Sequence, residues 1–172
     1  MKVKLFIFIS AFLFVLSANA QVQKFAYVNS DSVLRSIPAY KVQMKTYESY
    51  VKQLQTQLKT KQTTLQQKFG EYQQNGKDWV PNVREQKEKE LTELDIEIKT
   101  FAQTSQVNMQ KKQQELMEPL LVKVQGAIES IAKEESINFV LPEQTFLFTN
   151  TQYDITGKVI AKVNNVGGSN NE

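Results

Sequence analysis

The most regular feature of this sequence is a run of apolar residues spaced alternately three and four positions apart, beginning at Met44. The apolar positions of this frame are Met44, Tyr47, Val51, Leu54, Leu58, Leu65 and Tyr72. Such a spacing is the a/d heptad of a coiled coil, and it predicts one helix over residues 39–72. Lys61 and Lys68 fall in the same frame and interrupt its apolar seam. We therefore expect a long rod whose outer part is loosely packed.

A second heptad pattern follows and predicts another long helix, over residues 82–135. Its apolar positions are Leu91, Leu94, Ile98, Phe101, Leu116, Leu120, Val124, Ile128 and Ile131. The seam weakens between Ser105 and Lys112, where polar residues occupy the frame. Pro119 lies inside this stretch, and proline lacks the N–H that a helix interior needs. We expect Pro119 to kink the helix or to start a new segment, and Gly126 to be a second soft point.

Residues that end helices and start turns separate the two patterns. Gly70, Asn75-Gly76 and Pro81 lie close together, as at the end of one helix and the start of the next. The sequence therefore predicts an antiparallel hairpin over residues 39–123, with its tip near residues 70–82. A single uninterrupted parallel coiled coil is the alternative.

The two ends of the chain carry shorter patterns. Lys24 to Val28 reads as a strand, followed by N-capping residue types and a short helical turn before Pro38. Residues 137–141 and 146–149 read as two further strands, and Asp154 is placed to cap a short helix over residues 155–163. Residues 164–172 are rich in Gly and Asn and predict a disordered tail.

These short elements predict a small body built from both ends of the chain, residues 21–38 and 124–163. A body of about three short strands has exposed sheet edges and little core. It would not be stable alone, so we expect it to close its edges against other copies of itself.

The first 20 residues have the pattern of a secretory signal peptide. A basic start with Lys2 and Lys4 precedes an apolar run from Leu5 to Leu16, and Ala18-Asn19-Ala20 follows. We expect cleavage after Ala20, with an uncleaved anchor as the alternative.

Composition narrows the possible chemistry. The chain contains no cysteine and no histidine. Disulfides, thiol chemistry, imidazole catalysis and the usual zinc sites are therefore excluded. Carboxylate pairs such as Glu88 and Glu90 lie in charge-rich, solvated helix, and no phosphate-binding loop or nucleophile motif is present. We expect no enzyme activity, no cofactor and no metal.

Charge is unevenly distributed between the two rods. Without Lys2 and Lys4 the 21 Lys and Arg become 19, against 18 Asp and Glu, so the mature chain is close to neutral. Residues 35–72 nevertheless carry seven basic and two acidic residues. Lys45, Lys52 and Lys59 mark this basic face. It is either neutralised across the hairpin or free to attract anionic lipid head groups or acidic protein segments; nucleic acid is not expected for an exported chain.

The hairpin tip is rich in apolar side chains, which have no core to enter there. They are Phe69, Tyr72, Trp79 and Val80. They either pack on one another and hold the turn, or form an adhesive tip that contacts apolar surfaces of other proteins.

Both ends of the mature chain resemble those of the Skp/OmpH family. The opening residues 25–30, Phe-Ala-Tyr-Val-Asn-Ser, lead through Val33-Leu34 to Pro38, and Ile137-Asn138-Phe139-Val140-Leu141 with residues 154–160 resemble the family's end. The resemblance implies a mainly α fold with a small β head: a coiled-coil hairpin projecting from a β-barrel-like trimerisation body. The residues we expect in that body are Phe25, Tyr27, Val28, Leu34, Phe139, Leu141, Phe146 and Phe148.

The resemblance also implies a function. Members are homotrimeric periplasmic chaperones that hold unfolded outer-membrane proteins between helical tentacles, without ATP, and prevent aggregation. We expect this function here, with Phe69, Tyr72, Trp79 and Val80 as client contacts and an anionic lipid surface as a second partner. The alternative is a structural or tethering coiled-coil protein of the cell envelope without chaperone activity.

Overall fold

The computed structural model describes residues 23–165, so the predicted signal peptide with its cleavage site and residues 166–172 of the predicted tail lie outside the described residues. In chain order the elements are β1 (Phe25–Val28), α2 (Ser30–Ser36), α3 (Pro38–Asn75), α4 (Pro81–Glu134), β2 (Phe139–Pro142), the 3-10 helices η1 (Glu143–Thr145) and η2 (Thr151–Tyr153), and α5 (Thr156–Asn165). The prediction of a mainly helical chain with a small sheet is confirmed.

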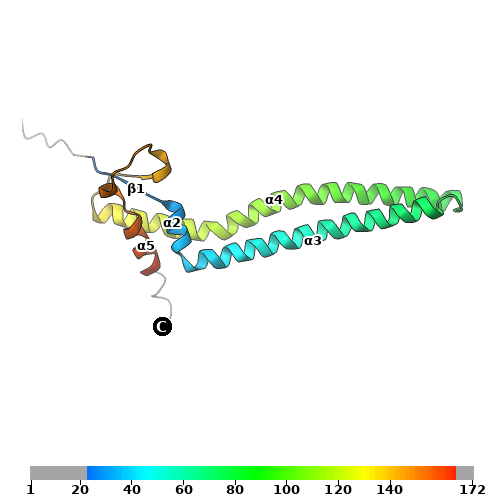
Figure 1. Ribbon diagram of the computed structural model, residues 1–172, viewed down its shortest axis with the longest axis horizontal. Helices are drawn as coiled ribbons and strands as arrows, with labels where there is room; N and C mark the ends of the chain where they lie inside the picture. The colour runs from blue at the N-terminus through cyan, green and yellow to red at the C-terminus, as the bar shows by residue number, and fades with distance from the viewer. Residues whose placement is uncertain (1–22, 166–172) are drawn as a thin grey trace, which may run out of the picture.

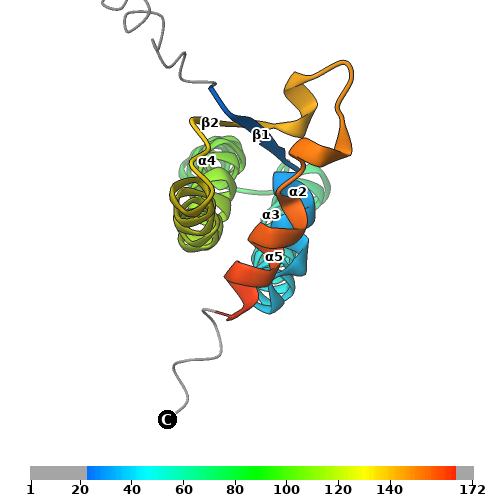
Figure 2. The same ribbon diagram turned by 90° about the vertical axis from the view of Figure 1, so that its left-hand side faces the viewer.

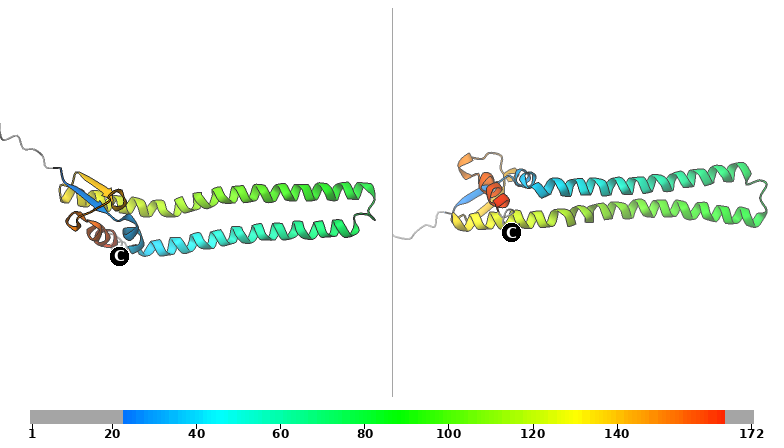
Figure 3. Two further views of the ribbon diagram at one scale, coloured as in Figure 1. Left: turned by 45° about the horizontal axis from the view of Figure 1, so that its top comes forward. Right: turned by 90° about the horizontal axis from the view of Figure 1, so that it is seen from below.

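The two long helices lie side by side and antiparallel, and they project far beyond a small head (Figures 1 and 3). Pro38 and Pro81 stand in the first turns of α3 and α4, where the missing N–H costs no hydrogen bond. At the far end, the Gly76 N–H donates to the Tyr72 carbonyl at 2.9 Å and closes α3. α3 contains no buried residue, so its apolar seam is only half covered by α4.

Of the two expectations for Pro119, a kink or a new segment, the new segment is wrong, because α4 continues through this residue (Figure 1). Proline cannot donate to the carbonyl four residues earlier, here that of Glu115. Pro119 and Glu115 are both exposed, so water can take the place of the missing donor.

The head is formed where the two ends of the chain meet (Figure 2). β1 pairs in parallel with β2, with Phe25 opposite Phe139 and Val28 opposite Pro142. Asn29 then joins three elements. Its Oδ1 accepts from the Ser32 N–H at 2.8 Å and caps α2, its Nδ2 donates to Glu143 Oε2 at 2.6 Å, and its own N–H donates to Thr156 Oγ1 at 2.9 Å.

The hydrophobic core lies in the head, between β1, α2, α5 and the last turns of α4. Val33, Val159 and Val163 are completely buried. The core also includes Ala26, Val28, Ile37, Leu120, Val124, Ala127, Ile131 and Ile155. Leu120 precedes the predicted body range of 124–163, because the core reaches one turn further down α4.

The predicted strand at 146–149 is wrong. That segment has no strand partner, and a single bridge between Tyr27 and Asp154 borders β1 on its second side. The 3-10 turns before and after the segment bend it away from the sheet. The helix predicted from 155 runs from Thr156 to Asn165, with the Thr156 N–H donating to Asp154 Oδ1 at 2.8 Å. α5 therefore includes Asn164 and Asn165 of the predicted tail.

Between residues 23 and 165, none of the helices combines the length and the apolar character needed to cross a membrane.

Candidate functional site

An aromatic groove runs across the head beside β1. It has a volume of about 670 Å³, and its apolar lining comes mainly from Phe25, Tyr27, Phe146, Phe148 and Tyr153. Tyr27 forms the buried side, with its ring 6.2 Å from that of Phe146.

Two lysines on the wall of the groove bond to Glu135. Lys24 Nζ donates to the Glu135 carbonyl at 3.0 Å, and Lys158 Nζ lies 2.5 Å from Glu135 Oε1. Nearby, Lys162 pairs with Glu134, and this hydrogen bond, together with one from Ser130, holds the pKa of Glu134 below its usual value. The groove therefore combines an aromatic floor with charged groups on its wall, among them Lys24 and Asp154.

The loop that follows η1 carries the most exposed apolar side chains of the head. Leu147 has a relative accessibility of 109% and Phe148 one of 85%. Leu147 is not among the residues that line the groove. Leu147 and Phe148 are adjacent in the chain, so this loop carries a small exposed apolar patch.

The residues predicted for a trimer body divide into two groups. Tyr27 and Val28 are buried inside the head, and Leu34 and Leu141 are half-buried. The exposed group lies on the head surface and consists of Phe25, Phe139, Phe146 and Phe148. Phe25 and Phe139 stack with their ring centroids 5.3 Å apart. The exposed group is therefore available for contact, whereas the buried group supports it from within.

The predicted tip residues also divide. Tyr72 and Trp79 pack edge to face with their rings 5.9 Å apart, and Lys87 Nζ lies 5.9 Å from the centre of the Trp79 ring. Phe69 and Val80 remain 49% and 63% exposed. One pair thus holds the turn, and the other two side chains stay open to contact.

Sequence reasoning missed the polar groups that complete the tip. The Tyr72 hydroxyl donates to Glu88, and this bond raises the pKa of Tyr72. Arg84 Nε donates to the Gly76 carbonyl at 3.1 Å. The sequence contains both the Tyr72 hydroxyl and the Glu88 carboxylate, but it does not show that they face each other. Their contact depends on the register of α3 against α4.

Lys61 and Lys68, which interrupt the apolar seam, form ion pairs across the hairpin. Lys61 Nζ lies 2.5 Å from Glu97 Oε1, and Lys68 Nζ lies 2.5 Å from Glu90 Oε1. The bond from Lys68, reinforced by Lys87, lowers the pKa of Glu90. Part of the basic charge of the first rod is therefore neutralised by the second.

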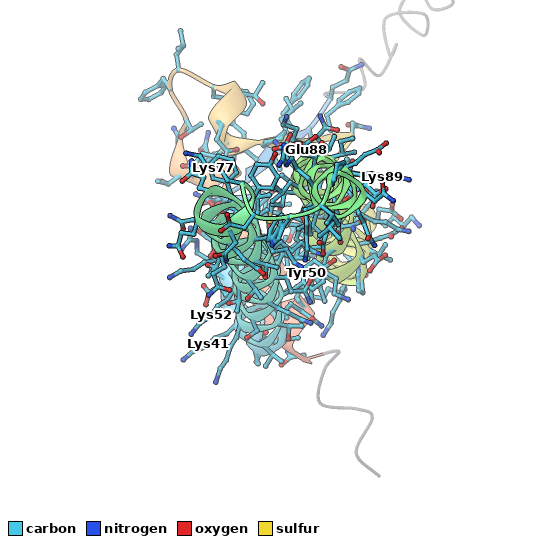
Figure 4. All side chains as sticks on the ribbon, turned by 90° about the vertical axis from the view of Figure 1, so that its right-hand side faces the viewer. Lys41, Tyr50, Lys52, Lys77, Glu88 and Lys89 are labelled. Atoms are coloured by element: carbon cyan, nitrogen blue, oxygen red, sulfur yellow. The ribbon has the colours of Figure 1, made fainter. Side chains whose placement is uncertain are left out.

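The basic face has a different environment. Lys45, Lys52 and Lys59 are exposed, and none of them forms an ion pair within residues 23–165. Figure 4 shows Lys41 and Lys52 extending from α3 to the same side, away from α4. Their spacing of seven places the three lysines on one face of the helix. In the same part of the chain no cluster of acidic side chains is arranged to bind a metal ion.

Comparison with known proteins relates this arrangement to one family. The family described as "Outer membrane protein (OmpH-like)" matches residues 24–163. Among curated proteins, "Chaperone protein Skp" of Pectobacterium atrosepticum is 25% identical over 152 residues, covering 87% of this chain and 92% of that protein. The protein of the same name from Yersinia enterocolitica is 24% identical over 147 residues, covering 86% of this chain and 90% of that protein.

A solved structure shows the same fold. The crystal structure of an OmpH-like protein from Caulobacter crescentus superimposes with a TM-score of 0.72, covering 86% of this chain and 88% of that chain. The sequences are 14% identical, so this likeness supports the arrangement of head and hairpin alone.

Proposed function

The chain belongs to the OmpH-like outer membrane protein family, and on this premise we propose that it is a periplasmic holdase chaperone that works without ATP. Its clients would be unfolded outer-membrane proteins. The chaperone name of the curated relatives supports this proposal, and so does the resemblance of residues 1–20 to a signal peptide.

Two features together carry the proposal. The head has exposed aromatic side chains, and the projecting hairpin has no cavity of its own. Phe148 in the head is 85% exposed, and α3 has no buried residue along its whole length. If three heads pack through their aromatic surfaces, three hairpins extend from one body and surround a cavity. A single hairpin has no such interior.

The physical need for such a cavity comes from the client. An unfolded β-barrel protein exposes apolar side chains and unpaired strands, which associate with those of other chains. Many weak contacts from several hairpins would hold it through avidity and would still break one at a time for release. No step of this cycle requires a nucleotide.

The client contacts we propose lie on the hairpin. Phe69 and Val80 are the exposed apolar groups of the tip, and the turn held by Tyr72 and Trp79 positions them. The lysines of the basic face would attract acidic client segments along α3. An anionic lipid surface is a second partner that the same lysines fit.

An aggregation assay with the mature chain tests the chaperone proposal. A denatured outer-membrane protein is diluted from urea, and light scattering is followed with and without the chain in near-stoichiometric amount. We expect scattering to be suppressed without ATP. A Phe69→Ser/Val80→Ser variant should suppress less, and Val42→Ser, which changes an exposed valine of α3 near the head, serves as the matched control.

The mass of the oligomer tests the architecture separately. Size-exclusion chromatography with light scattering should give three chains, and a stable monomer would contradict the trimer. A trimer without any effect on aggregation would instead favour the tethering role.

A further inference from the structure

The turn at the tip of the hairpin contains a reactive pair of residues, Asn75 followed by Gly76. The backbone nitrogen that follows an asparagine can attack the asparagine side-chain amide, and a Cβ on the following residue hinders this attack. Glycine has no Cβ. Asn75 is the one asparagine of the sequence that a glycine follows. It is exposed and ends α3, at the end of the hairpin that lies farthest from the head (Figure 1).

Asn29, the asparagine that precedes a serine, has a different environment. Its side-chain oxygen accepts from the Ser32 N–H at 2.8 Å, and its side-chain nitrogen donates to Glu143 Oε2 at 2.6 Å. Both ends of that amide are therefore held in place. The side-chain amide of Asn75 takes part in none of the hydrogen bonds that hold the tip together within the described part of the chain. It is therefore the more accessible of the two amides.

The turn requires glycine at position 76. Gly76 is buried, and a Cβ on it would lie 2.5 Å from the Tyr72 carbonyl oxygen, closer than non-bonded atoms approach. That oxygen belongs to the backbone of α3, so it cannot move aside as a flexible side chain could. The Gly76 carbonyl also accepts from Arg84 Nε at 3.1 Å. The close packing of the turn therefore keeps the reactive pair in the sequence.

The same turn holds the attacking nitrogen back. The Gly76 N–H donates to the Tyr72 carbonyl at 2.9 Å, and the Asp78 N–H donates to the Asn75 carbonyl at 3.0 Å. The Gly76 nitrogen can reach the Asn75 side chain only when these bonds open and Asn75 leaves its helical conformation. Opening costs little here, because helix ends fray and the last turn of α3 carries no basic residue to compensate the helix dipole.

We propose that Asn75 is a site of spontaneous deamidation, which proceeds when the turn opens. The Gly76 nitrogen gives up its proton and forms a bond to Asn75 Cγ, and the Cγ–Nδ2 bond breaks, so that Nδ2 leaves as ammonia with the added proton. Water then hydrolyses the cyclic imide at one of its two carbonyls. The products are aspartate and isoaspartate, and water is the one co-reactant.

Either product alters the tip. It places a negative charge in the last turn of α3, at the negative end of the helix dipole. Isoaspartate also adds a methylene group to the backbone, which displaces the Gly76 N–H from the Tyr72 carbonyl. Tyr72 and Trp79, whose rings pack 5.9 Å apart beside this turn, would then separate. The change is a property of the turn, so it would occur whether or not the chain is a chaperone.

Peptide mapping of the full mature chain tests the site. The chain is kept in mildly alkaline buffer, folded or in guanidinium chloride, and samples are digested with trypsin and analysed by mass spectrometry. Cleavage after Lys68 and Lys77 separates Asn75 from every other asparagine. In the folded chain, Asn75 should gain one mass unit about tenfold faster than Asn29 and give two products. Conversion in guanidinium chloride alone, or equal rates at the two sites of the folded chain, would overturn the proposal.

A change in the turn should change the rate. Arg84→Gln removes the donor to the Gly76 carbonyl and should speed conversion of the folded chain about threefold. Lys89→Gln removes an equal charge from an exposed position of the same helix and should leave the rate unchanged. In guanidinium chloride, both variants and the wild-type chain should react alike. Equal folded rates for Arg84→Gln and wild type would overturn the control of the reaction by the turn.

Asn75→Asp reproduces one product and tests the consequence. Fluorescence of Trp79, the single tryptophan, should change at a lower temperature than in the wild-type chain. Asn75→Gln, whose longer side chain does not form the five-membered imide, should behave as wild type. Gln66→Glu adds the same charge at an exposed position of α3 before its last turn and should have no effect. Unchanged tip stability in both Asn75→Asp and the purified isoaspartate form would overturn the loosening of the turn.

Discussion

The head and the outer hairpin of this protein are stabilised in different ways. The head encloses a core in which Val33, Val159 and Val163 have no exposed surface. The outer hairpin has no core, and cross-rod bonds from Lys61, Lys68 and a tyrosine hydroxyl lie where apolar pairs would otherwise be. Exposed ion pairs contribute little to stability, whereas apolar burial contributes much. The head therefore carries the free energy of folding, and the outer hairpin can open at little cost.

The largest expected effect comes from comparing a leucine-to-alanine substitution in the head part of α4 with one in its outer part. Leu120→Ala removes a buried side chain from the head core and should lower the free energy of unfolding by about 3 kcal/mol. Leu94→Ala, at a half-buried seam position in the outer hairpin, should lower it by about 1 kcal/mol. Urea unfolding followed by circular dichroism, at equal chain concentration, measures both. Equal losses would show that the two regions do not differ.

Ser105 offers a way to strengthen the hairpin. Its hydroxyl is buried in the rod without a hydrogen-bond partner in the described structure. Ser105→Ala removes an unsatisfied polar group and should raise the free energy of unfolding by about 1 kcal/mol. The exposed Ser49→Ala is the matched control and should have almost no effect. If Ser105→Ala destabilises the chain instead, the hydroxyl has a partner such as a bound water.

Ser136 offers the corresponding change in the head. It follows the end of α4 with φ of 53°, a left-handed conformation that favours glycine, and the next N–H, of Ile137, bonds back to Ala132 at 2.8 Å. Ser136→Gly should raise the thermal midpoint, with a gain of about 0.5 kcal/mol. Ser136→Val should lower it. A glycine variant that lowers the midpoint, or a valine variant that raises it, would contradict this account of the turn.

The smallest expected effect is a local response of the tip to acid. The pKa of Glu90 is lowered in the folded chain by Lys68, so its contribution is complete above its ordinary value of 4.5 and is lost as pH falls through the lowered pKa. Fluorescence of Trp79, the single tryptophan, should stay constant from pH 7 to about 5 and change below about 4.5, before helix content falls.

Variants separate this response from general acid unfolding. Glu90→Gln should remove most of the fluorescence change, because the residue no longer titrates. The head also contains a carboxyl of lowered pKa, Glu134, and Glu134→Gln should leave the fluorescence of the tip unchanged. A change that persists in Glu90→Gln would place its origin at another group.

Local patterns predicted most of the fold. The heptad patterns predicted the ends of α3 and α4 to within a few residues. Asn75-Gly76 and Pro81 predicted the turn between them. Two strands were also predicted near their observed positions. The third, at 146–149, failed because a short run of Phe, Leu and Phe is typical of a strand but does not show whether another strand is available to pair with it.

The candidate site was less predictable. Phe25, Tyr27, Phe146 and Phe148 were named for the body from their type, but Tyr153 was not named. That these residues from both ends of the chain line one groove could not be read from the sequence. Leu147, between two predicted residues, was missed because exposure depends on tertiary position. The tip residues were named correctly as apolar and clustered in sequence, but which of them pack together depended on the turn geometry.

By itself, the sequence determined the long helices, their turn and the meeting of both chain ends, because hydrophobic period, proline and glycine act over a few residues. Only the tertiary structure decided that Lys61 pairs with Glu97 and Lys68 with Glu90, because these ion pairs depend on the register of the two helices. It also decided which aromatic residues of the head are buried and which stay on its surface. Burial is a property of packing between distant segments, and a linear pattern records only that a residue is apolar.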